Sequence, residues 1–178
     1  MAIQTRPLGR TGTDVTVLGY GAMELRGRPH GPDVDDQEAG RLPDHIAMGV
    51  FGVFQIPYSA VQREHEDLIT AGAGTLIRGG AARGAPAEDK NWRRGPIGLA
   101  EGEGKRRWDA SGVDDLLGGM SRLEFVLRFT LSHPDLSSTI VGTSRVGHLH
   151  ANLAIAEKGP LPADVYEQAR RRLDPARA

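Results

Sequence analysis

Four short apolar runs constrain the fold more strongly than any other feature of the sequence. They occupy residues 15–20, 50–57, 74–78 and 139–142, and each ends at or just before a glycine or a proline. Their β-branched and aromatic residues are typical of buried strands. Consecutive runs lie too far apart for hairpins, and helix-like stretches separate them. Because such spacing requires crossover connections, the sequence predicts an α/β fold with a parallel sheet.

The amino-terminal segment predicts one exception, a β-hairpin that precedes the parallel strands. Residues 3–6 and 14–18 flank the turn sequence P-L-G-R-T-G-T. Gly9 and Gly12 in this turn permit positive φ angles, which tight hairpin connections require. The second arm of the hairpin continues into the first apolar run.

Two capping-box patterns predict the starts of helices. Ser59 and Gln62 form the first box, so we expect a helix from there to about residue 70. Ser121 and Glu124 form the second box, and the apolar stripe that follows predicts a helix up to His133. Residues 113–117 predict a helical turn, and residues 147–158 and 162–173 predict two further helices. Residues 79–111 are rich in glycine, proline and charge, and they predict a long loop.

Length and charge place the chain among ordinary globular proteins. With 178 residues it can form one domain with its own core. A net charge of −1 gives no reason to expect a nucleic acid or an acidic membrane as a partner. The absence of cysteine excludes disulfides, thiolate nucleophiles and cysteine-bound metals. No stretch approaches the ~20 apolar residues of a membrane span, so we expect a cytoplasmic protein.

The stretch T-I-V-G-T-S-R-V-G-H-L-H-A-N, residues 139–152, joins a strand end to a helix start. Free N–H groups at a helix start favour an anion, and Thr143 and Ser144 can add hydroxyl donors. Arg145, His148 and Asn152 follow at spacings of three and four, which places them on one helical face. This face could hold a phosphate and a polar ring. The alternative is a plain helix cap followed by a solvated polar stripe.

Two other strand ends carry candidate binding residues. In R-G-G-A-A-R-G, residues 78–84, Gly79 and Gly80 would let a phosphate approach the backbone while Arg78 supplies charge. A glycine-rich turn is the alternative. Tyr58 follows the run 50–57, where an aromatic ring could stack on a flat ligand or simply close a barrel mouth. The histidines offer no metal site, since His148 and His150 would point to different helix faces.

Taken together, these stretches resemble the aldo-keto reductases, NADPH-dependent (β/α)₈-barrel oxidoreductases that reduce carbonyl compounds. R-P-L-G-R-T-G-T-D-V-T-V-L-G-Y-G-A-M-E-L is similar to the family's entry hairpin and first strand. V-F-G-V-F-Q-I-P-Y-S-A-V-Q-R-E-H-E-D resembles its sixth strand, and G-T-L-I-R-G-G-A-A-R-G-A-P falls where the seventh belongs. T-L-S-H-P-D-L-S-S-T-I-V-G-T-S-R-V-G-H-L-H-A-N-L resembles its eighth strand and cofactor-binding helix.

The resemblance implies that NADP(H), if any cofactor is bound, lies along the ends of these strands. Tyr58 would stack on the nicotinamide, and residues 78–84 would lie along the pyrophosphate. His148 would approach the adenosine 2′-phosphate and Asn152 the adenine. The full set of implied cofactor-binding residues is Gly21, Ala22, Met23, Tyr58, Arg78, Gly79, Gly80, Thr143, Ser144, Arg145, His148 and Asn152.

The residues that perform the family's chemistry have no counterpart in the sequence. The reaction needs a Tyr, a Lys, an Asp and a His on or after the second, third and fourth strands. Here the sequence passes from Leu42 to Pro43, which already resembles the approach to the sixth strand. The only lysines are Lys90, Lys105 and Lys158, and none follows a predicted strand. We therefore expect no catalytic tetrad and no carbonyl reduction by this chain.

The chain length agrees with an internal deletion. A (β/α)₈ barrel takes about 250 residues, so on the order of 100 are missing. We expect one truncated domain over residues 1–178, a partial TIM-type barrel with strands that resemble 1, 6, 7 and 8. Residues 1–32 would form the hairpin and first strand, and residues 43–175 the carboxyl-terminal half barrel. Its two bare edges predict a homodimer or another partner; a cofactor-binding module and a functionless remnant are the alternatives.

Overall fold

A computed structural model describes residues 4–21, 53–70, 74–82, 102–143 and 145–174. Its centre is a parallel sheet of four strands, β3 (Leu18–Gly21), β4 (Val53–Pro57), β5 (Gly74–Arg78) and β6 (Ser138–Gly142). The order across the sheet is β3-β6-β5-β4. Strand β3, the first of the four in the chain, therefore pairs with β6, the last in the chain. The predicted α/β fold is confirmed. The described strands do not form a closed barrel.

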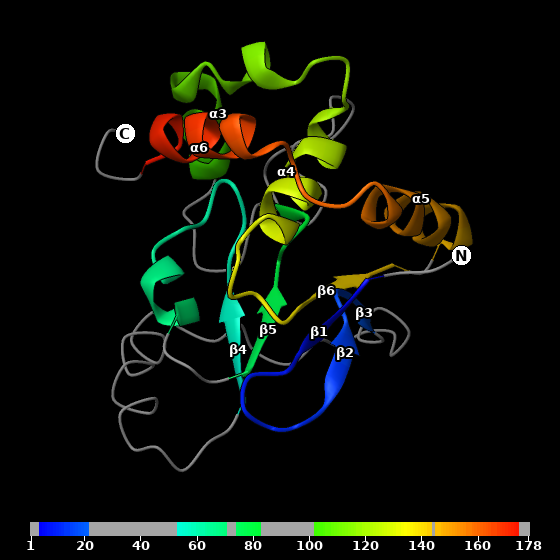
Figure 1. Ribbon diagram of the computed structural model, residues 1–178. Helices are drawn as coiled ribbons and strands as arrows, with labels where there is room; N and C mark the ends of the chain where they lie inside the picture. Colours follow the sequence, from blue (N-terminus) through cyan, green and yellow to red (C-terminus); the bar gives the residue numbers. More distant parts are fainter. Residues whose placement is uncertain (1–3, 22–52, 71–73, 83–101, 144, 175–178) are drawn as a thin grey trace.

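The predicted hairpin forms beside this sheet from β1 (Thr5–Pro7) and β2 (Asp14–Thr16), which pair antiparallel (Figure 1). Gly9 and Gly12 both have positive φ in the connecting turn, as expected. The hairpin contacts the amino-terminal end of the sheet at Gly74, the first residue of β5. A Cβ atom there would lie 2.9 Å from Leu8 Cδ1, so a larger residue would require Leu8 to shift.

The other described elements are helical, and they pack against the sheet through shared hydrophobic clusters. They are the 3-10 helices η2 (Glu66–Thr70) and η5 (Val113–Leu116), and the α-helices α3 (Glu103–Ser111), α4 (Arg122–Leu131), α5 (Val146–Glu157) and α6 (Ala163–Arg172). Figure 1 shows α3, α4 and α6 grouped together, with α5 beside β6. Helix α4 begins as predicted, since the Ser121 side chain accepts a hydrogen bond from the Glu124 N–H.

Two predictions about local structure are wrong. The pair Ser59 and Gln62 does not cap an α-helix but closes a tight turn, in which each backbone N–H donates to the other residue's carbonyl. Among the described residues up to β5, the short η2 is the helical element that follows. Helix α3 lies within the predicted loop 79–111, and it forms because Trp108 enters the core while Gly112 ends the helix in the left-handed conformation.

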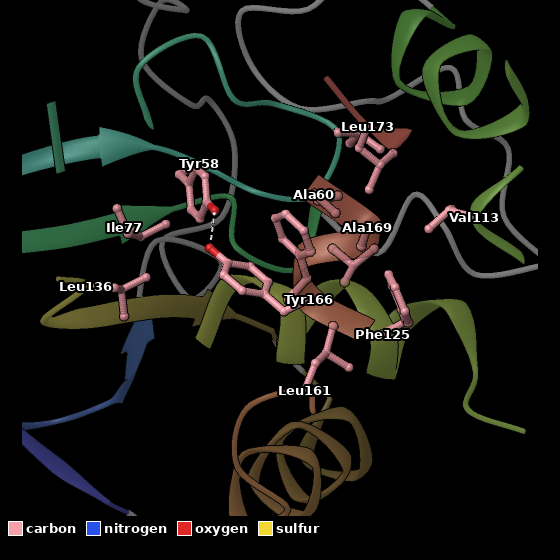
Figure 2. Packing of buried hydrophobic residues seen from close by; sticks show 14 of the residues in the cluster. Tyr58, Ala60, Ile77, Val113, Phe125, Leu136, Leu161, Tyr166, Ala169 and Leu173 are labelled. Atoms are coloured by element: carbon pink, nitrogen blue, oxygen red, sulfur yellow. Dashed lines mark hydrogen bonds between the residues drawn. The ribbon is translucent and has the colours of Figure 1, made fainter. Parts of the chain in front are cut away.

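Two hydrophobic clusters join the helices to the sheet, and Figure 2 shows residues of the larger one. The larger contains Ile56 and Ile77 from the sheet and Phe125 and Phe129 from α4. The smaller contains Val17, Leu18, Leu127, Leu131, Val141, Ile155 and Ala156. Helix α4 therefore contributes to both clusters and is the central support of the sheet. No helix among the described residues is long and apolar enough to cross a membrane.

Candidate functional site

The carboxyl ends of three neighbouring strands meet at one edge of the sheet. Gly21 at the end of β3 is the register partner of Gly142 at the end of β6. Arg78 at the end of β5 is the register partner of Ile140, two residues before Gly142. Three sequence-predicted binding segments are thus side by side, although they are far apart in the chain. Ala22, Met23 and Ser144 lie outside the described residues.

The sheet face opposite the helices carries the side chains that a ligand at this edge would meet. Gln55 is exposed between the buried Phe54 and Ile56, while Leu76, Arg78 and Ile140 are partly exposed. Gln55 pairs in register with Leu76, so this open face is continuous from β4 to β6. Sequence reasoning missed Gln55. A polar residue between two large apolar residues in a strand was the available signal, because side chains alternate between faces.

Tyr58 does not lie on this open face. Its ring is fully buried in the larger cluster, 6.2 Å from the Phe129 ring centroid and 5.5 Å from that of His133. The hydroxyl donates to Glu66 Oε1 at 3.2 Å and lies 3.5 Å from the Tyr166 hydroxyl (Figure 2). The expectation that Tyr58 stacks on a nicotinamide does not fit this position, because the helix layer encloses the ring on the covered face of the sheet.

The surroundings of Tyr58 also make its hydroxyl a poor acid. Burial raises its pKa far above the ordinary value, and the neighbouring Tyr166 and Glu66 raise it further. Burial likewise raises the pKa of Tyr166. Glu66 is held by Arg63 at 2.5 Å and by Arg170 at 3.2 Å, so the buried carboxylate has two cationic partners. Buried and paired in this way, these residues form a structural network of the core.

Backbone conformation and packing explain the two glycines that follow β5, Gly79 and Gly80. Gly79 adopts φ +74°, which favours glycine in the turn. At Gly80 a Cβ atom would lie 2.1 Å from Thr139 Oγ1 and 3.0 Å from Thr130 Cγ2. The Gly80 carbonyl also accepts a hydrogen bond of 2.8 Å from Thr130 Oγ1. The packing of β5 against α4 and β6 therefore accounts for Gly80 without any ligand.

The start of α5 carries the remaining candidates. Arg145 is the N-cap residue in an extended conformation, and its N–H donates to Thr143 Oγ1 at 3.1 Å. Arg145 and His148 are exposed, whereas Asn152 is buried. The predicted shared helical face of Arg145, His148 and Asn152 is thus split, because Arg145 precedes the helix and Asn152 faces the interior. Two of the three candidates remain accessible to an anion beside Gly142.

The described residues contain no group of three or more His, Cys, Asp or Glu side chains that could hold a metal ion. They also bring no lysine to the sheet edge. Lys105 in α3 pairs with Asp109, and Lys158 after α5 pairs with Glu124 at 2.8 Å. Lys90 lies outside the described residues. Neither of the two described lysines is placed to lower the pKa of a tyrosine at the carboxyl ends of the strands.

The architecture defines the class of protein. A parallel sheet with crossover helices on one face, closed at its amino-terminal end by a hairpin, is part of a (β/α)₈-type barrel. The order β3-β6-β5-β4 is the order expected for first, eighth, seventh and sixth barrel strands.

Comparison with known proteins shows which solved structures have a similar fold. The sequence matches no protein-family model and no curated protein. Among solved structures, the holo form of aldo-keto reductase AKR11C1 from Bacillus halodurans is similar to this chain with a TM-score of 0.57 and 20% identity. The apo form gives the same TM-score with 21% identity. Each match covers 74% of this chain and 46% of the solved chain. The chain therefore has an aldo-keto reductase-like fold and spans less than half the length of those structures.

Proposed function

We propose that this chain is a half barrel of aldo-keto reductase ancestry that binds NADP(H) but does not reduce carbonyl compounds. One observation carries the proposal. The strand order brings Gly21, Gly142 and Arg78 to one edge of a parallel sheet, although these residues lie in three distant parts of the sequence. Ligands of parallel α/β sheets bind at the carboxyl ends of the strands. The cofactor-binding side of the ancestral barrel is accordingly the side that this chain keeps.

The residues at this edge fit an anionic dinucleotide. Thr143, Arg145 and the start of α5 offer a hydroxyl, a cation and a helix amino terminus to a phosphate. His148 lies one turn further on and is exposed. On the open sheet face, the Gln55 amide and Arg78 are the polar groups for the nicotinamide end. We assign no stacking role to Tyr58. NADP(H) would supply hydride chemistry if a carbonyl substrate and a proton donor were also present.

We infer that no proton donor stands at this end of the sheet among the side chains that the structure describes. Tyr58 and Tyr166 are buried in the core and hydrogen-bonded there. Lys105 and Lys158 are paired with acids on helices. We infer that the segment bearing the ancestral tetrad was lost between Leu42 and Pro43. The proposed unit is one domain over residues 1–178, with parts 1–32 and 43–175, working in the cytoplasm.

Fluorescence titration of the full chain with NADPH tests cofactor binding. We expect saturable binding that Arg145→Ala weakens by about tenfold, as for the loss of one charge-assisted phosphate contact. Arg171→Ala, which removes another exposed arginine from α6, is the matched control and should leave the affinity unchanged. In the same samples we expect no aldehyde-dependent oxidation of NADPH. Absence of binding would leave the chain as a remnant without cofactor function, and turnover would show a proton donor that this proposal omits.

The two outermost strands of the sheet favour a second candidate function, which is self-association. Among the described residues, β3 and β4 each have one strand neighbour, so both outer edges of the sheet lack a paired strand there. Edge strands readily pair with another chain. Size-exclusion chromatography with light scattering should then give a dimer or larger species. A cooperatively unfolding monomer at all concentrations would exclude this second candidate while leaving the cofactor proposal intact.

A further inference from the structure

Arg6 holds the hairpin to the loop between α4 and β6. From β1, its Nη1 donates to the carbonyls of His133 and Leu136, each at 3.0 Å. Its Nη2 donates to the Leu131 carbonyl at 3.0 Å. Leu131 is the last residue of α4, so the guanidinium also satisfies a carbonyl at the helix end. One side chain thus connects two segments that are more than 120 residues apart in the sequence.

The His133 side chain makes a hydrogen bond within the loop that Arg6 binds. The residue is 4% exposed, and its Nδ1 accepts a hydrogen bond from the Asp135 N–H at 3.2 Å. An imidazole nitrogen that accepts carries no proton, so the ring is neutral with its hydrogen on Nε2. The ring also packs edge-on against Tyr58, with an interplanar angle of 84°. The loop conformation therefore depends on neutral His133.

The charged groups around His133 have opposite effects on its pKa. Arg6 from β1 and Arg170 from α6 disfavour a second positive charge, whereas Glu66 from η2 and Asp135 from the same loop favour it. Tyr58, which follows β4, faces the ring without a charge. Burial is the largest influence, and it lowers the pKa of His133 below the ordinary value of 6.5.

We propose that Arg6, His133 and Asp135 form an acid-sensitive latch, which holds the β1–β2 hairpin against the sheet while His133 is neutral and releases it when His133 is protonated. A proton on Nδ1 would face the Asp135 N–H donor and break that hydrogen bond. The loop would then move the carbonyls of His133 and Leu136 away from Arg6. Among the described residues, the hairpin would keep the contact of Leu8 with Gly74, the proximity of Gln4 to Gly159 and the hydrogen bond from the Val17 N–H to the Gln4 carbonyl.

The direction of the pH effect follows from proton linkage. The closed latch binds fewer protons than the open one, because the pKa of His133 is lowered only when the latch is closed. Closure is therefore complete above the ordinary pKa of about 6.5 and is lost as the pH falls from there towards the lower value. With a single proton taken up, the opening constant increases by at most about tenfold per pH unit.

Hydrogen exchange of the full chain between pH 7.5 and pH 5.0 tests the latch. After correction for intrinsic rates, hairpin amides should exchange several-fold faster at the acidic end, while amides in α4 and β6 stay protected. The NMR titration of the His133 ring in the same wild-type sample should have the midpoint at which the hairpin opens. The proposal would be overturned if exchange of the hairpin amides did not change with pH, or if amides throughout the sheet accelerated equally. It would also be overturned if the hairpin opened at a pH where the His133 ring does not titrate.

Two variants separate the latch from a general effect of acid. In His133→Asn, the Oδ1 atom takes the place of Nδ1 as the acceptor for Asp135 but does not titrate, so the hairpin should stay closed with a flat profile. His150→Asn removes an exposed histidine from α5 that has no assigned role, and its hairpin should show the pH profile of the wild type. If the hairpin amides of a folded His133→Asn variant still exchanged faster at acidic pH, the role of His133 would be disproved. The wild-type ring titration decides the matter if that variant does not fold.

Discussion

Substitution of Gly80 by alanine tests whether this glycine serves packing or ligand approach. The added Cβ atom would meet Thr139 Oγ1 at 2.1 Å and Thr130 Cγ2 at 3.0 Å, far inside ordinary contact distances. Overpacking a well-filled site costs about 1–3 kcal/mol. Rotating Thr139 away would also lose its 3.3 Å hydrogen bond to the Ile77 carbonyl, roughly 1 kcal/mol more. We therefore expect the free energy of unfolding to fall by about 2–4 kcal/mol.

Urea unfolding followed by far-UV circular dichroism measures this loss, and two further variants interpret it. Gly147→Ala is the matched control, because nothing lies within 4 Å of the position that its Cβ atom would take and the residue is in the exposed part of α5. It should be neutral or stabilising by up to about 1 kcal/mol. Adding Thr139→Ala to the Gly80 variant should restore more than about 1 kcal/mol, close to the clash energy, in a double-mutant cycle. Equal effects of the Gly80 and Gly147 variants, or additivity in the cycle, would refute the packing argument.

Three other predictions concern the core and the helices. Tyr58→Phe removes the hydrogen bond to Glu66 and should lower the free energy of unfolding by about 1 kcal/mol. The affinity for NADPH should not change, and weaker NADPH binding would show that Tyr58 contacts the cofactor. Ser121→Ala removes the side-chain cap of α4 and should cost about 1 kcal/mol in the same urea assay, whereas Ser121→Asp should cost little. The hydrogen bonds from Arg122 lower the pKa of Asp114, so the pair should stabilise the fold above about pH 4 and lose this effect as the pH falls through the lower folded value; an unshifted carboxyl titration by NMR would contradict this.

The strands could be predicted from the sequence because their apolar runs are short and sharply bounded. The runs 74–78 and 139–142 correspond closely to β5 and β6, and the spacing between runs excluded hairpins. The capping boxes show the limit of local patterns. Ser121 precedes a clear helical stripe, and its helix forms. Residues 57–62 are all buried in succession, a pattern that no amphipathic helix can produce, and the chain turns there instead.

The candidate site could be predicted at the level of strand ends, and side-chain direction only where alternation is followed along the strand. The neighbouring positions of Gly21 and Gly142 follow from the parallel order. Tyr58 comes two and four residues after the buried Ile56 and Phe54, so alternation indicates the covered face on which it lies. Gly80 was ambiguous for a different reason. Its contact with Thr139 involves residues 59 positions apart in the sequence, which no local pattern reveals.

NMR mapping of NADPH binding on the isotope-labelled full chain tests the central claim most directly. The account predicts saturable chemical-shift changes confined to the carboxyl ends of β3, β5 and β6, to Gln55 in β4 and to the start of α5. The affected residues should include Gly21, Arg78, Gly142, Thr143, Arg145 and His148. The core residues Tyr58 and Tyr166 should be unaffected. Shift changes centred on the hairpin or α6, or no change at millimolar NADPH, would contradict the claim that this half barrel keeps the cofactor side of its ancestral fold.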